Sequence, residues 1–150
     1  MLRVLVQPEL FDMGAEMDRL SAGSRSIGGI SVFMGQVRDG PDGLASLTLE
    51  HYPGMTEKVL TALADEAVRR FSLTGCTLIH RVGTLPVGAP IVFVGTSSAH
   101  RAEALAGTNF LIDRLKTGAP FWKCERYHDG RCVWVDAREA DDKASALWDE

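Results

Sequence analysis

Four basic side chains in one stretch of the sequence could together bind and activate an anion. The stretch runs from 97 to 125 and reads SSAHRAEALAGTNFLIDRLKTGAPFWKCE. His100 and Arg101 stand near its beginning, and Lys116 and Lys123 stand on either side of a Gly-Ala-Pro break. An arginine fork binds phosphate or carboxylate through paired hydrogen bonds, and a lysine can stabilise developing negative charge or transfer a proton. These residue types therefore indicate chemistry on an anionic ligand.

The residues between these basic groups predict a helix from about 99 to 116. Apolar and small side chains recur with the 3.6-residue period of a helix that packs one face on a core, at Ala104, Leu105, Thr108, Leu111, Ile112 and Leu115. Lys116 would complement the negative end of the helix dipole. His100 and Arg101 would lie at the positive end, where two cations are unfavourable unless an anion binds there. The residues alone leave open an anion site or an ordinary pair between Arg101 and a carboxylate.

The composition is that of one domain over residues 1–150, which is long enough to bury a sizeable core. The net charge of −4 argues against a general nucleic-acid binder. The three cysteines, Cys76, Cys124 and Cys132, show neither C-x-x-C spacing nor an associated His pattern, so we expect neither a disulfide framework nor a zinc site. Because no signal-like segment or long apolar run is visible, the expected location is the cytoplasm.

The spacing of apolar residues, glycines and prolines predicts alternating strands and helices. We expect strands at 2–7, 27–39, 44–52, 77–82, 91–97, 120–128 and 131–136, helices at about 12–20, 53–72 and 99–116, and a weakly helical tail at 140–150. The strands at 27–39 and 44–52 are predicted to pair as a hairpin through the DGPDG turn. This order of elements predicts an α+β fold in which helices cover one face of a mainly antiparallel sheet.

The last two predicted strands flank an Asp-Gly pair at 129–130, which is a two-residue hairpin signal. Pairing across that turn places Tyr127 opposite Cys132. Alternation along the first of these strands puts three side chains on one face, those of Lys123, Glu125 and Tyr127. Cys124 then lies on the other, more apolar face, and Cys132 does not share that face. We therefore expect no disulfide between the two cysteines.

Five segments match one known family in the same order and with matching spacing. They are FMGQVRD at 33–39, LEHYPGM at 49–55, HRVGTLPVG at 80–88, SSAHR at 97–101 and LKTGAPFWKCE at 115–125. On these segments the chain resembles the large, catalytic subunit of molybdopterin synthase, from about residue 28 to residue 148. The resemblance implies an α/β hammerhead fold and a homodimer that binds a small ubiquitin-like subunit at each end, giving a heterotetramer.

The same resemblance implies a sulfurtransferase of molybdenum cofactor biosynthesis. In that family the small subunit carries a C-terminal Gly-Gly thiocarboxylate, which enters a pocket of the large subunit. Its sulfur is transferred to cyclic pyranopterin monophosphate, and two such transfers form the dithiolene of molybdopterin. Because the small subunit carries the sulfur, the large subunit supplies positioning and charge rather than the sulfur itself. We expect no resident cofactor and no metal ion.

Site residues are implied by position in the matching segments. Lys116 matches the family's essential lysine, and Lys123 matches its second active-site lysine. Three further residues match those that hold the phosphate and nearby groups of the pterin, namely Arg38, His100 and Arg101. Arg138 matches an arginine that the neighbouring large subunit contributes. The chain departs from the family at Cys124, where a basic residue is usual.

Two other functions fit parts of this pattern. In a cysteine persulfide sulfurtransferase, Cys124 would be the nucleophile and Lys123 would activate it, although the predicted apolar face suits a packed cysteine better. In a non-catalytic phosphate-binding or regulatory module, Arg38, His100 and Arg101 would only hold a phosphorylated ligand. Simple retention of phosphate requires neither Lys116 nor Lys123, so the lysine pair favours the enzyme.

Overall fold

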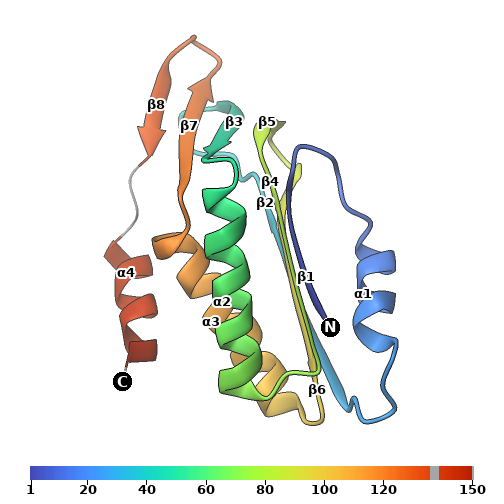
Figure 1. Cartoon of the computed structure of the whole chain (residues 1–150). Coiled ribbons are helices and arrows are strands. Elements are labelled where there is room, and N and C mark those ends of the chain that lie inside the picture. The colour runs from blue at the N-terminus through green and yellow to red at the C-terminus, as the bar shows by residue number, and fades with distance from the viewer. Residues whose placement is uncertain (136–138, 150) are drawn as a thin grey trace.

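The computed structural model of the chain describes residues 1–135 and 139–149 (Figure 1). The strands are β1 (Leu2–Gln7), β2 (Gly29–Gln36), β3 (Leu44–His51), β4 (Gly75–Arg81), β5 (Gly83–Pro86), β6 (Pro90–Ser98), β7 (Phe121–Tyr127) and β8 (Cys132–Val135). The helices are α1 (Met13–Ser21), α2 (Met55–Phe71), α3 (Arg101–Gly118) and α4 (Glu139–Ala146), followed by the short 3-10 helix η1 (Leu147–Asp149). No helix within these described ranges is long and apolar enough to cross a membrane.

The first sheet has the strand order β1-β4-β6-β2, with β1 parallel to β4 and the other pairs antiparallel. Side chains alternate between its two faces. Leu78 and Val94 pack with α2 and α3 on one face, whereas Ile79 and Phe93 pack with Leu20 of α1 on the other. Figure 1 shows α1 on the side of this sheet away from α2 and α3. The α+β class is confirmed, and the structure adds a helix on the second face.

The second sheet has the strand order β5-β3-β7-β8 and is antiparallel throughout. The predicted hairpin of 27–39 with 44–52 is therefore wrong, because β2 pairs with β6 and β3 pairs with β5 and β7. The loop at 37–43 carries the chain from one sheet to the other. Strand β5 was not predicted, because it has only four residues, with a glycine and a proline at its ends, and this composition is typical of a loop.

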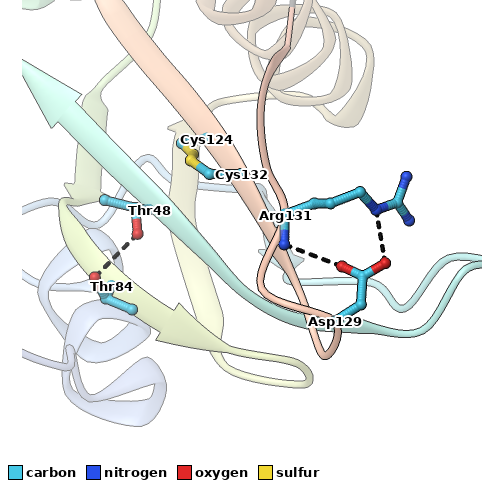
Figure 2. Close-up of a disulfide and its surroundings, with 6 residues drawn as sticks. All are labelled: Thr48, Thr84, Cys124, Asp129, Arg131 and Cys132. Carbon is cyan, nitrogen blue, oxygen red and sulfur yellow. Dashed lines mark hydrogen bonds and ion pairs between the residues drawn. A yellow bond between two sulfur atoms is a disulfide. The ribbon is translucent and has the colours of Figure 1, made fainter.

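The β7–β8 hairpin closes through a three-residue loop rather than the predicted two-residue turn. The Gly130 N–H donates to the Tyr127 carbonyl at 3.0 Å, and the Tyr127 N–H donates to the Arg131 carbonyl at 2.9 Å. Gly130 takes a φ of 93°, as expected for a type I turn followed by a left-handed residue. The Asp129 carboxylate stabilises this loop by accepting two hydrogen bonds from Arg131, one from its backbone N–H at 3.0 Å and one from its Nε at 2.7 Å (Figure 2).

The extra loop residue shifts the strand register by one. The predictions that Cys124 and Cys132 lie on opposite faces and that they form no disulfide were therefore both wrong. Arg126 pairs with Cys132, and Cys124 pairs with Trp134. A shift of one residue moves every side chain of a strand to the opposite face. Cys124 and Cys132 therefore share a face, with Cα atoms 6.1 Å apart, and form a disulfide (Figure 2).

Helix α3 packs against β2 and β6 as the apolar spacing predicts, with two differences. Its buried residues are Ala104, Gly107, Thr108, Phe110 and Leu111. Leu105 was predicted to face the core but is 60% exposed, and Phe110 was not predicted. Thr108 fixes the helix on the sheet, because its hydroxyl lies 2.9 Å from that of Thr96 and 3.3 Å from the Ser31 carbonyl, to which it donates.

The C-terminal segment docks on α3. The Trp148 indole N–H donates to the Asp113 carboxylate at 2.8 Å, and its ring packs on Phe71 and Phe110. Arg114 donates to the Asp149 carboxylate at 2.8 Å. The predicted helical tail is therefore anchored at its far end, by contacts to α3 residues that precede it by 35 positions in sequence.

Candidate active site

A cleft of about 1020 Å³ lies where the end of β2, the end of α3 and the strand β7 come together. Arg38, Lys116 and Lys123 all line it. These three residues are separated by up to 85 positions in the sequence, from 38 to 123, so only the fold brings them to one site. The structure thus gathers half of the six predicted site residues into one cleft.

Arg38 is held between two fixed neighbours. The Val37 N–H donates to the Ala89 carbonyl at 2.9 Å, and the Val37 carbonyl accepts from Gly88 at 2.7 Å. On the other side, the Asp39 carboxylate accepts from the backbone N–H groups of Gly40 and Leu44, both at 2.8 Å. The backbone of Arg38 is therefore well defined, while its side chain is exposed towards the cleft.

The two lysines reach the cleft from consecutive elements. Lys116 is exposed in the last turn of α3, where its charge suits the helix dipole. The chain then turns at Pro120, whose carbonyl accepts from the Thr56 hydroxyl at 3.2 Å, and enters β7. Lys123 is half-buried on β7 between its cross-strand neighbours Leu49 and Val135. A helix end and a strand thus bring two ammonium groups to one cleft.

His80 also lines the cleft and was not predicted as a site residue. It is 7% exposed, and its ring stacks on Phe121 with centroids 3.9 Å apart and planes at 19°. Its Nδ1 lies 2.8 Å from the Arg81 carbonyl. Burial lowers the pKa of His80 to about 4; the hydrogen bond to Arg81 opposes this, and the charges of Lys123 and His51 lower the pKa further. The sequence feature that could have indicated His80 as a site residue is its position at the end of a largely apolar predicted strand.

Glu125 and Tyr127 form a hydrogen-bonded pair in the same cleft. The Tyr127 hydroxyl donates to Glu125 at 3.1 Å, and this bond is the main cause of the raised pKa of Tyr127. Their position on the Lys123 face follows from strand alternation, as predicted. Among the described residues, four carboxylates line the cleft beside its three Lys and Arg side chains, those of Asp39, Asp42, Glu125 and Asp141. One chain by itself therefore does not make a strongly cationic cleft.

His100 and Arg101 lie elsewhere. His100 is the N-cap of α3 and Arg101 its first residue, and both side chains are exposed. The 18 residues of α3 correspond to about 27 Å along the helix axis, so this pair is far from the Lys116 end of the same helix. Arg138 lies outside the described residues.

Glycines allow β2 to start directly against this end of α3. A Cβ at Gly28 would collide with the Ala99 carbonyl oxygen, and one at Gly29 would lie 3.2 Å from the Arg101 Cα. The Ser98 hydroxyl donates to the His100 carbonyl. The glycines at the start of β2 therefore let its backbone lie directly against the backbone at 99–101, as the sequence predicted. This contact fixes the position of His100 and Arg101 relative to the first sheet.

Residues 6–118 match the family model described as MoaE protein. The chain belongs to the MoaE family. It is similar to the molybdopterin synthase catalytic subunit of Cereibacter sphaeroides, with 47% identity over 147 residues that cover 98% of this chain and 100% of that relative. The match confirms the family that the five sequence segments indicated.

Solved structures of MoaE-family proteins share the fold. The molybdopterin biosynthesis MoaE protein from Burkholderia ambifaria has a TM-score of 0.85 and 45% identity, covering 100% of this chain and 99% of that one. The molybdopterin synthase from Staphylococcus aureus has a TM-score of 0.76 and 29% identity, covering 89% and 96%. The two-sheet arrangement is therefore that of the MoaE family.

The structure does not support the hypothesis that Cys124 carries a persulfide. Cys124 is 1% exposed and is bonded to Cys132. A persulfide carrier needs an accessible thiolate in an electropositive setting. A buried sulfur in a disulfide does not offer one, so Lys123 is better assigned to the cleft than to activation of its neighbour.

Proposed function

We infer that this MoaE-family chain is the catalytic subunit of a molybdopterin synthase, and we propose that it acts as a sulfurtransferase. The observation that carries the proposal is the meeting of Lys116, Lys123 and Arg38 in one cleft. Its relatives of similar length bear the name of that subunit. We propose a single domain over residues 1–150 that works in the cytoplasm.

The proposed sulfur donor is the C-terminal thiocarboxylate of a small ubiquitin-like subunit, and the proposed acceptor is cyclic pyranopterin monophosphate. Both are anions, so fixed cations are needed to offset their repulsion. Attack by the sulfur on a carbon of the pterin side chain forms a C–S bond while a C–O bond at that carbon breaks, and the oxygen that leaves takes up a proton. Water then hydrolyses the resulting thioester, which leaves the sulfur on the pterin and a carboxylate on the small subunit. Lys116 and Lys123 would stabilise the oxyanion that develops at the acyl carbon or transfer the proton that the leaving group requires.

We further propose that each active site is shared between two copies of the chain. Within one chain the carboxylates of the cleft outnumber its Lys and Arg side chains, four to three among the described residues. His100 and Arg101 lie about 22–24 Å from Lys116 along α3, so they can serve the cleft only from a second copy. Two-fold symmetry would then build two such sites per homodimer. We propose that Arg138 also reaches the cleft from the second copy.

The direct test is to mix the purified protein with a thiocarboxylated small subunit and the pterin precursor and to measure dithiolene formation. The matched control is the same small subunit with an ordinary C-terminal carboxylate, which should give no product. Deleting its terminal glycine should also abolish transfer, because the reacting group would no longer reach the lysines. Tight precursor binding without product would instead identify a binding or regulatory module.

A further inference from the structure

The proposed reaction ends in a hydrolysis, and this step needs a group that activates water. Water attacks the acyl carbon of the thioester, and a side chain that takes up its proton accelerates such a step by roughly 100-fold or more. The ammonium groups of Lys116 and Lys123 are hydrogen-bond donors, which suits them to the oxyanion at that carbon and not to accepting a proton. The base is therefore expected among the carboxylates of the cleft.

Glu125 is the cleft carboxylate that shares a strand with Lys123. Both side chains are half-buried, line the cleft and lie on the same face of β7. Two residues of an extended strand span about 7 Å, so the two side chains reach the same part of the cleft. The carboxylate of Asp39 already accepts two backbone hydrogen bonds, Asp42 is exposed on the loop, and Asp141 comes from α4.

The carboxylate of Glu125 is held at one of its two oxygens. The Tyr127 hydroxyl donates to Oε2 at 3.1 Å. The neighbours of Glu125 across the strands are apolar, namely Leu47 on β3 and Val133 on β8. A carboxylate accepts several hydrogen bonds over its two oxygens, so the bond at Oε2 leaves Oε1 able to accept from a water molecule.

Tyr127 is in turn fixed by the loop of the β7–β8 hairpin. The guanidinium carbon of Arg131 lies 4.8 Å from the centre of the Tyr127 ring. The Asp129 carboxylate holds that guanidinium group through Nε at 2.7 Å, as Figure 2 shows. The hydrogen bond to Glu125 raises the pKa of Tyr127, so the phenol stays protonated and keeps donating. The loop thus orients Tyr127, and Tyr127 orients Glu125.

We propose that Glu125, oriented by Tyr127, is the general base that activates the water molecule that hydrolyses the thioester. The carboxylate takes a proton from the water while the water oxygen bonds to the acyl carbon. The C–S bond at that carbon then breaks, and its electron pair leaves with the sulfur as a thiolate on the pterin. The carboxyl group formed on the small subunit ionises, and Glu125 releases its proton to the solvent. This role rests on the proposed sulfur transfer, of which it is one step.

The test separates the two steps of a single turnover. The full-length chain is mixed with the thiocarboxylated small subunit and the pterin precursor, and intact mass spectrometry follows the small subunit. Glu125→Gln keeps an acceptor for Tyr127 but cannot take up a proton. It should form the thioester within about threefold of the wild-type rate and hydrolyse it about 100-fold more slowly, so that the small subunit linked to the pterin accumulates. Hydroxylamine, a stronger nucleophile than water, should cleave this adduct.

Two further variants complete the experiment. Tyr127→Phe keeps the ring beside Arg131 but loses the hydroxyl, so it should slow hydrolysis by about fivefold, as expected for one lost hydrogen bond. Glu50→Gln is the matched control. Glu50 is exposed and pairs with Trp122 on the other face of the same sheet, so this variant should show wild-type rates for both steps.

The possible outcomes distinguish this role from the function on which it rests. A folded Glu125→Gln protein that hydrolyses the thioester at the wild-type rate would overturn the proposal, and so would slower thioester formation with no accumulated adduct. If Glu125→Gln does not fold, a folded Tyr127→Phe protein with wild-type hydrolysis would exclude the oriented carboxylate. Wild-type protein that forms neither thioester nor dithiolene would refute the sulfur transfer itself.

Discussion

Arg101 and Lys116 lie at opposite ends of helix α3, with Arg101 at its first residue and Lys116 in its last turn. Their separation of 15 residues (116 − 101) corresponds to about 22 Å along the axis. A single chain therefore cannot bring both side chains to one small substrate. If both are required, each active site must combine the Lys116 end of one copy with the Arg101 end of another.

This arrangement predicts complementation between two inactive variants. Lys116→Ala and Arg101→Ala proteins should each be severely impaired. After co-refolding in equal amounts, about half of the dimers are mixed, and each mixed dimer has one intact site, so about a quarter of all sites should work. Dithiolene formation by the mixture, compared with each variant alone, is the measurement.

A mixture of Lys116→Ala with Lys123→Ala is the matched control, because both residues line the cleft of one chain and no pairing restores it. A Lys116→Ala and Arg101→Ala mixture that exchanges subunits yet stays inactive would exclude the shared site. The same experiment with Arg138→Ala in place of Arg101→Ala asks whether Arg138 also acts across the dimer.

Removing either cleft lysine should affect catalysis far more than folding. We expect Lys116→Ala to lower turnover by about 100-fold or more, because a preorganised cation beside the developing oxyanion is lost. Its free energy of unfolding should change by less than about 0.5 kcal/mol, since the side chain is exposed. Lys58→Ala, at an exposed position of α2, should match wild type in both measurements. Wild-type turnover by Lys116→Ala would remove this lysine from the mechanism.

The disulfide between Cys124 and Cys132 should stabilise the protein without taking part in transfer. It closes a short loop, with a sequence separation of 8, for which the chain-entropy model predicts about 2–3 kcal/mol. Cys132→Ser should therefore lower the free energy of unfolding under oxidising conditions and have little effect with reductant present. Its activity, and that of Cys124→Ser, should remain close to wild type. Loss of turnover in a well-folded Cys124→Ser protein would revive the persulfide route.

Acid should destabilise the folded protein through His80. The unfolded chain takes up a proton at this histidine near its ordinary pKa of 6.5, whereas the folded protein does so only near 4. Protonation therefore favours the unfolded state between these values, and stability falls with decreasing pH by up to about 3 kcal/mol. Urea unfolding at pH 7 and pH 4.5 should show a smaller loss for His80→Phe than for wild type. Equal losses would show that His80 does not titrate in this way.

The helices and the family could be predicted from the sequence because their signals are local. Helical hydrogen bonds join residues four apart, so the spacing of apolar residues predicted α2 and α3 to within about two residues of their ends. The motifs around Lys116 and Lys123 are contiguous, which is why they identified the MoaE family. Alternation along β7 likewise placed Glu125 and Tyr127 on the face of Lys123.

Only the tertiary structure decided how the strands pair. The partners of β2 and β3 lie far away in sequence, so the DGPDG turn between them indicated a hairpin that does not form. One extra loop residue before Arg131 reversed the faces of β8 and brought Cys124 beside Cys132. The stack of His80 on Phe121 likewise depends on where the two sheets meet. Such contacts depend on long-range packing, whose geometry no local spacing encodes. The opposite positions of Arg101 and Lys116 on α3, in contrast, follow from helix geometry and could be predicted from the sequence.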